Sequence, residues 1–179
     1  MTTITINRAP VLTLWAAVVA ERLGYDRDEA VTLGRAVAGL NAATKAQALG
    51  LAKPGGKAKF EKSAKAAAHG GRDEVPLCNR LVPIVHTPDG VRATSDGRPT
   101  DPASVHRYLE SKFGDALEDA RAAMTALAKS RSKTELAASA FELYEAFRPA
   151  IAKGVRGWGA KGVLDLGRIR ALAESEPGR

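Results

Sequence analysis

The chain has 179 residues, which suits one domain, or one domain with a small appendage, and is long enough for a hydrophobic core. Hydrophobic residues make up 45% of it, but many are alanine and only 5% of the residues are aromatic, which favours packed helices over a β-sandwich or barrel. The formal net charge is +7, no apolar run approaches the roughly 20 residues of a membrane-spanning helix, and the single cysteine, Cys78, excludes an intrachain disulfide.

The basic charge is concentrated in two blocks. Residues 53–72 contain six basic residues against one acid, and residues 148–179 contain seven against three. The other segments carry net charges between +1 and −2. Charge that served only solubility would be spread evenly, so two concentrated blocks favour an anionic partner. The first residues lack the basic region of a secretory signal, and the reducing cytoplasm is the expected location.

Residues 1–52 predict a helical hairpin. Residues 2–6 alternate in a strand-like way, but they are too few for more than an edge strand or a disordered lead-in. Apolar residues then recur at helical spacing in two runs, and Gly34 and Gly39 inside the second run each cost about 1 kcal/mol relative to alanine. A close crossing of the two helices would explain both glycines. The expected boundary residues are Asn7 as a cap, Pro10 in the first turn, Gly24 as a stop, and Asp26 with Glu29 as a capping box.

The hairpin at residues 10–49 is too apolar to stand alone. We expect it to be buried either in the second half of the chain or in another copy of the protein. In the second case a symmetric homodimer would form. The sequence favours neither this dimer nor an intramolecular core over the other. Two helices joined by a short turn are similar to histone-fold and helix-turn-helix units, although no signature residue accompanies this likeness. The side chains proposed for the dimer seam are Trp15, Val19, Val37 and Leu40.

The stretch from Lys53 to Arg72 predicts contact with nucleic acid. Its apolar residues are mostly alanine, so it cannot bury enough surface to offset its ordering entropy, and we expect it to be mobile. Lysines that neutralise phosphates release condensed counterions, which gives affinity without sequence preference. The Lys-Ala-Pro-Gly composition is similar to that of the tails of bacterial nucleoid proteins and linker histones, and the alternative is a solvated linker. The expected phosphate contacts are Lys53, Lys57, Lys59, Lys62, Lys65 and Arg72.

The region after the basic stretch predicts a small β-hairpin followed by helices. Leu77–Thr87 is rich in Val, Leu and Ile, and Thr-Pro-Asp-Gly at 87–90 is a strong turn signal that leads back into Val91–Thr94. Pro83 is expected on an edge strand or at a bulge. Helices should follow, with Pro149 preventing continuation of the third. The expected caps are Asp101, Asp115, Ser132 with Glu135, and Asp165.

The glycine-rich loop Gly154–Gly162 is a second candidate site for an anion. Its backbone N–H groups could reach a phosphate while the indole of Trp158 offers a stacking surface, and Arg156 and Lys161 supply charge. The loop is similar in glycine content to a phosphate-binding loop. However, Gly162 replaces the Ser or Thr that would hold Mg²⁺, and a helix precedes it, so nucleotide hydrolysis is not predicted. The alternative is a structural loop in which Trp158 fills the core.

Metal binding and catalysis have little support in the sequence. Cys78, His69, His86 and His106 form no pair with zinc-like spacing, and a cysteine in an apolar strand is more often a packing residue than a nucleophile. The carboxylates are helix caps or surface charges without an obvious catalytic pair. No metal or cofactor is predicted, and enzymatic activity stays open but is not favoured.

The sequence therefore predicts a mainly α-helical protein with a short β-hairpin, divided into residues 1–52, 53–72 and 73–179. The expected function is non-enzymatic binding of nucleic acid, double-stranded DNA in particular, in the cytoplasm or nucleoid. The alternatives are a protein-interaction or self-association module with a basic linker, and a binder or enzyme for a small anion at the glycine-rich loop. The more rigid second patch of nucleic-acid contacts is expected to comprise Arg156, Trp158, Lys161, Arg168 and Arg170.

Overall fold

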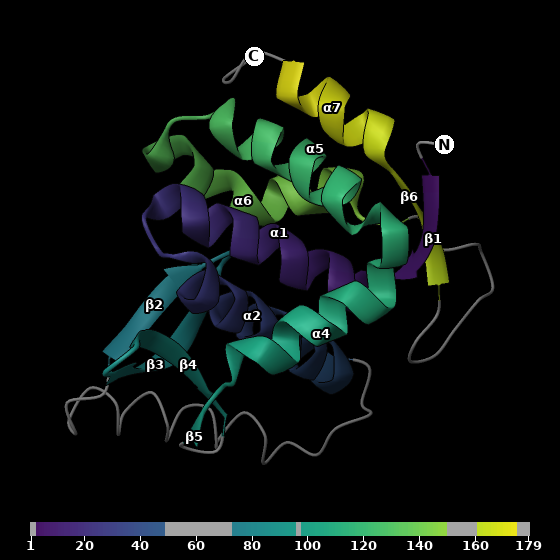
Figure 1. Cartoon of the computed structure of the whole chain (residues 1–179). Coiled ribbons are helices and arrows are strands. Elements are labelled where there is room, and N and C mark those ends of the chain that lie inside the picture. The colour runs from purple at the N-terminus through teal and green to yellow at the C-terminus, as the bar shows by residue number, and fades with distance from the viewer. Residues whose placement is uncertain (1–2, 49–72, 96–97, 150–160, 175–179) are drawn as a thin grey trace.

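The computed structural model describes residues 3–48, 73–95, 98–149 and 161–174 (Figure 1). It confirms a mainly α-helical fold with a small antiparallel sheet. In chain order the elements are β1 (Thr3–Asn7), α1 (Arg8–Leu23), α2 (Arg27–Ala48), β2 (Asp73–Leu77), β3 (Arg80–Thr87), β4 (Gly90–Ser95), β5 (Arg98–Pro99), α4 (Pro102–Phe113), a 3₁₀ turn (Gly114–Ala116), α5 (Leu117–Lys129), α6 (Lys133–Phe147), β6 (Lys161–Asp165) and α7 (Leu166–Glu174). No helix of these four ranges is long and apolar enough to cross a membrane.

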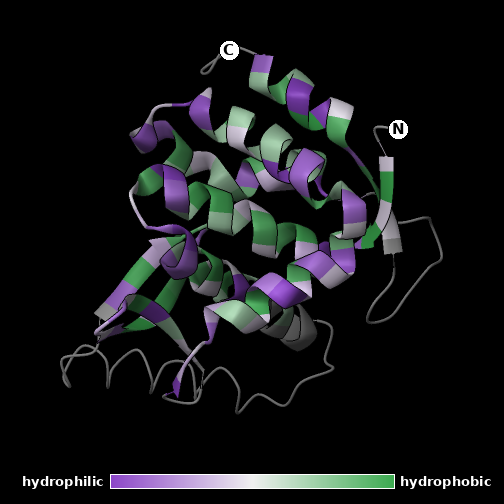
Figure 2. Cartoon of the chain, in the orientation of Figure 1, coloured by the Kyte–Doolittle hydropathy of each residue, from purple (hydrophilic) through white to green (hydrophobic). Residues whose placement is uncertain are grey.

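Helix α1 is the centre of the fold. It contacts α2, α4, α5 and α6, and every residue from Pro10 to Ala20 is buried. Figure 2 shows hydrophobic residues along α1 between its charged ends. A helix can be covered on all sides in this way because the buried stretch has no charge to desolvate, and its one hydroxyl, on Thr13, donates to the Ala9 carbonyl at 2.8 Å. The apolar hairpin is thus buried against the second half of the same chain.

This intramolecular core corrects the proposed dimer seam. The side chains of Trp15, Val19 and Val37 are each 0% exposed, and Leu40 is packed against the same core. The indole N–H of Trp15 donates to the Ala140 carbonyl of α6 at 2.8 Å, and its ring meets Phe147 edge to face. Side chains that fill the chain's own core cannot also form a seam with a second copy.

The crossing of α1 and α2 explains one of the two helical glycines. A Cβ atom added to Gly34 would lie 2.3 Å from the Thr13 carbonyl oxygen and 2.9 Å from the Ala17 amide nitrogen. The close approach expected from the sequence is therefore confirmed at Gly34. It is wrong for Gly39, which is exposed and has nothing within 4 Å of an added Cβ.

The predicted β-hairpin is confirmed and is part of a four-stranded antiparallel sheet in the order β2-β3-β4-β5. The expectation that Pro83 lies on an edge strand is wrong, because β3 has neighbours on both sides. The β3–β4 register stops at Ile84↔Ala93, next to Pro83, which has no N–H to donate. Side chains of α2 bind the other edge of β4: Glu29 Oε2 accepts from the Val91 amide at 2.8 Å, and Thr32 Oγ1 accepts from the Ala93 amide at 3.1 Å.

A second, two-stranded sheet joins β1 to β6. The strands are antiparallel, with register from Thr3↔Asp165 to Asn7↔Lys161. The strand character predicted for residues 2–6 is therefore confirmed from Thr3 onward, but the assignment of Lys161 and Gly162 to a loop is wrong. Ile6 and Leu164 are buried, so one face of this ribbon belongs to the core.

Most predicted helix boundaries are confirmed by hydrogen bonds. Asp26 and Glu29 cap each other reciprocally, with N···O distances of 3.0 and 2.8 Å. Two predicted caps are wrong. Asn7 makes no side-chain cap. Asp115 lies inside the 3₁₀ turn that runs directly from α4 into α5, so it does not immediately precede the first turn of a helix. The other confirmed boundary contacts come from Gly24, Asp101, Ser132 with Glu135, and Asp165.

Cys78 is a buried packing residue, as expected. It lies in the two-residue turn between β2 and β3, where Cys78 and Asn79 have φ of 48° and 63°. Burial raises the pKa of the Cys78 thiol from 9.0 to about 12, because the apolar surroundings disfavour the thiolate. The folded chain thus holds the thiol proton more tightly than the unfolded chain does.

We therefore expect the free energy of unfolding to fall as the pH rises above about 9, where the unfolded-state thiol loses its proton and the folded-state thiol keeps it. Stability from this residue is fully present below that pH and is lost progressively up to about pH 12. Urea denaturation at several pH values, followed by circular dichroism, measures the effect, and Cys78→Ala should flatten the decline. An equally steep decline in Cys78→Ala would assign it to other groups, such as Tyr144, whose pKa burial also raises to about 12.

Candidate nucleic-acid interface

The predicted nucleic-acid contacts fall mostly outside the described residues. Those outside are Lys53, Lys57, Lys59, Lys62, Lys65, Arg72, Arg156 and Trp158. For Lys161 the structure describes the backbone, in strand β6. Arg168 and Arg170 are both on α7 and both are exposed.

The two described arginines of α7 have different surroundings. The Arg168 Nε group donates a hydrogen bond to the Ala146 carbonyl in the last turn of α6, so this side chain ties α7 to a neighbouring helix. Arg170 has no hydrogen-bond or ion-pair partner among the described residues. Of the two, Arg170 is the better placed for an external contact, and Arg168 has a structural role that its sequence position did not indicate.

Arg168 is one of several arginines that bind backbone carbonyls near helix C-termini. Such carbonyls carry partial negative charge and lack a partner within their helix, so a guanidinium stabilises them. Burial lowers the pKa of Arg8, and repulsion from Arg148 lowers it further. Much of the arginine charge in the folded body is thus engaged internally. The other contacts are Arg8 to Pro149, at 3.0 Å, and Arg22 to Arg131 and Arg131 to Leu172, both at 3.3 Å.

Helix α4 presents a different arrangement on its outer side. At 3.6 residues per turn, five residues between Ser104 and Lys112 share one side of the helix over an arc of roughly 140°, and the exposed Glu110 lies next to this arc, beyond Arg107. This surface, which we call the α4 face, carries cations at Arg107 and Lys112, and hydroxyls lie between them. Arg107 and Lys112 are exposed and have no ion-pair partner within the described ranges. The α4 face consists of Ser104, Arg107, Tyr108, Ser111 and Lys112.

Helix α2 adds a further cation to the α4 face. The Arg35 guanidinium lies 4.5 Å from the centre of the Tyr108 ring, a cation–π contact across the α2–α4 seam. Burial raises the pKa of the Tyr108 phenol, and the nearby Arg35 charge opposes that shift. The phenol therefore remains protonated and can donate a hydrogen bond.

The elements that flank the basic segment and helix α7 lie at opposite ends of the described body. Residues 53–72 connect the end of α2 to the start of β2, and α2 contacts both α4 and the sheet. Helix α7 instead contacts α5 and β1. In Figure 1 the sheet, α2 and α4 occupy the lower half and α7 lies at the top. Among the described residues, Arg168 and Arg170 of α7 thus lie at the other end of the body from α2 and α4.

The sequence did contain a signal for the α4 face. Polar residues recur at 104, 107, 108, 111 and 112, which is helical spacing, but this pattern was not part of the prediction. Comparison of the chain with protein-family models, with curated proteins and with solved structures gives no match. The function is accordingly argued from the chain's own residues.

Proposed function

We propose that the protein binds nucleic acid through phosphate contacts made by the basic segment 53–72 together with the α4 face. The observation that supports this most is that the α4 face gathers two unpaired cations and three hydroxyls beside the helix from which the six-cation segment continues. Arg, Lys, Ser and Tyr side chains are the groups that bind phosphate oxygens in protein–DNA complexes. Helix α7, with Arg168 and Arg170, is not part of this interface, because it lies at the other end of the body.

The α4 face has dimensions suited to a nucleic-acid backbone. Ser104 and Lys112 are eight residues apart, which corresponds to about 12 Å along the helix axis. One strand of duplex DNA places a phosphate about every 3.4 Å along its axis, so this length faces roughly three phosphates. Contacts of this kind position a protein on DNA without reading its sequence, and duplex of random sequence is the expected ligand.

The test is a salt titration of binding to a random-sequence duplex, measured by fluorescence anisotropy. Each phosphate contact contributes about 0.9 to the slope of log affinity against log salt. The double variant Arg107→Gln/Lys112→Gln should therefore lower that slope by about 1.8. A variant that replaces Lys57, Lys59, Lys62 and Lys65 by Gln should lower it further.

The matched control removes two exposed cations elsewhere, by Lys133→Gln on α6 and Arg170→Gln on α7. It changes the net charge by the same amount as the α4 variant, so it separates a local interface from general attraction. We expect the control to keep the salt slope of the unmodified protein. An affinity that does not change with salt concentration would contradict the proposal. A control variant that binds as weakly as the α4 variant would also contradict it.

A further inference from the structure

A recess lies between α4 and α5, on the side of α4 away from the α4 face. The two helices diverge from the 3₁₀ turn that joins them, and the cleft between them has a volume of about 650 Å³. Leu109 of α4 and Leu117 of α5 provide apolar lining, and Arg27 at the start of α2 lines the same cleft. A recess of this size suits a small molecule.

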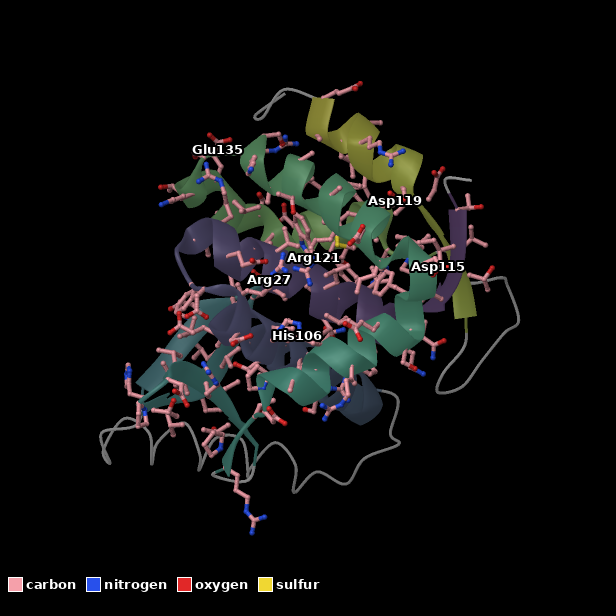
Figure 3. All side chains as sticks on the ribbon, in the orientation of Figure 1. Arg27, His106, Asp115, Asp119, Arg121 and Glu135 are labelled. Atoms are coloured by element: carbon pink, nitrogen blue, oxygen red, sulfur yellow. The ribbon has the colours of Figure 1, made fainter. Side chains whose placement is uncertain are left out.

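The charges along the cleft are separated by sign. Glu110 and Glu118 lie four residues before and two residues after the 3₁₀ turn, at the narrow end. His106 and Arg121 lie about one helical turn further out, and Lys129 is about 16 Å from Glu118 along α5. Figure 3 shows Arg27, His106 and Arg121 close together between α4 and α5. The wide end of the cleft therefore carries Arg27, Arg121 and Lys129, partly balanced by Glu21 and Asp28, and the narrow end is acidic.

The two arginines at the wide end share one carboxylate. Arg121 Nη1 lies 3.3 Å from Glu21 Oε2, and Arg27 Nε lies 3.8 Å from Glu21 Oε1. Burial lowers the pKa of Arg121, and repulsion from Arg27 lowers it further, while Glu21 opposes both. One carboxylate does not neutralise two guanidiniums, and each guanidinium has five N–H donors, so donors remain for a further acceptor.

The neighbouring histidine is also held in place. His106 Nε2 lies 3.1 Å from Asp28 Oδ1, which ties α4 to the first turn of α2. Glu21 and Asp28 thus hold Arg121 and His106 by hydrogen bonds before any ligand arrives, while the contact of Glu21 with Arg27 is an exposed ion pair. Binding groups that are already ordered lose less conformational entropy on binding.

We propose that this cleft binds a small amphoteric molecule, with a carboxylate or phosphate group between Arg27 and Arg121 and an amine directed at Glu110 and Glu118. An aliphatic middle would lie over Leu117, Ala122 and Ala126. The acidic narrow end rejects polyanions, so this site is separate from the nucleic-acid interface and does not rest on it. The order of charges along the cleft sets the orientation of the zwitterion, because in the opposite orientation each end would meet like charge, and it rejects a dianion, which would meet like charge at the narrow end.

The experiment is an NMR titration of the full chain with 5-aminopentanoate, and with pentanoate as the analogue that lacks the amine. We expect saturable shifts of the backbone amides of Ala122, Thr125 and Ala126, which line the cleft, with weaker binding of pentanoate. Arg27→Gln and Arg121→Gln should each weaken 5-aminopentanoate binding about tenfold, the effect of losing one hydrogen bond to a charged group. Arg170→Gln is the control and should leave the affinity unchanged.

Two further comparisons keep the result unambiguous. The Arg27 side chain is 63% exposed, so Arg27→Gln should fold normally even if the half-buried Arg121→Gln does not. The variant with Lys57, Lys59, Lys62 and Lys65 replaced by Gln should bind 5-aminopentanoate as the unmodified protein does. The inference is overturned if 5-aminopentanoate gives no saturable shifts, if pentanoate binds equally well, or if Arg27→Gln has no more effect than Arg170→Gln.

Discussion

Gly34→Ala is expected to destabilise the protein by about 3 kcal/mol or more, at the severe end of overpacking substitutions. The added Cβ would lie 2.3 Å from the Thr13 carbonyl oxygen, which belongs to the backbone of the central helix α1. A flexible side chain could rotate away, but this oxygen can move only if α1 shifts against α2. Because α1 contacts four other helices, that shift would disturb packing throughout the core. Urea denaturation followed by circular dichroism measures the change.

Gly39→Ala is the matched control, because it makes the same chemical change in the same helix. Gly39 is exposed and an added Cβ has nothing within 4 Å. The substitution should stabilise the protein by about 1 kcal/mol, the intrinsic preference of a helix for alanine over glycine. Equal effects of the two substitutions would show that α1 and α2 do not cross as closely as described.

Trp15→Ala is expected to cost about 3–5 kcal/mol, the usual range for removing a large buried aromatic side chain. The residue is 0% exposed, and its removal opens a cavity between α1 and α6. It also removes the 2.8 Å hydrogen bond to the Ala140 carbonyl and the edge contact with Phe147. Trp15→Phe should fall between Trp15→Ala and the unmodified protein, because it keeps a ring in the core but loses the donor.

The control for Trp15→Ala is Val163→Ala on β6, a hydrophobic residue that is 48% exposed. We expect that change to alter stability by no more than about 0.5 kcal/mol, as is usual for surface positions. The measurement is again urea denaturation followed by circular dichroism, since Trp15→Ala removes a fluorophore. Equal effects of Trp15→Ala and Val163→Ala on the free energy of unfolding would contradict the burial of the indole in the core.

Features encoded by neighbouring residues were predictable from the sequence. The capping pair Asp26 and Glu29 and the pair Ser132 and Glu135 were identified correctly, because each depends on residue types three positions apart. The turn at residues 87–90 was found for the same reason. Local rules hold here because the interacting groups are already close in the chain.

Features that depend on distant residues could not be predicted in the same way. Gly34 and Gly39 have similar local contexts, and only the tertiary contact with Thr13 distinguishes them. Arg168 was predicted to contact phosphate, yet its guanidinium binds the Ala146 carbonyl, because the same donors suit either acceptor. The cleft between α4 and α5 was missed because Arg27 and Arg121 are separated by the whole sheet region of the sequence.

The pairing of β1 with β6 has a consequence for biosynthesis. Residues 3–7 are translated long before their hydrogen-bonding partners at residues 161–165. During most of synthesis β1 therefore exposes the backbone edge that β6 covers in the folded molecule, as unpaired strand edges in incomplete chains do. Nascent chains stalled before residue 161 should accordingly be open to strand capture by chaperones at their N-terminal edge, and release from that state should coincide with emergence of β6.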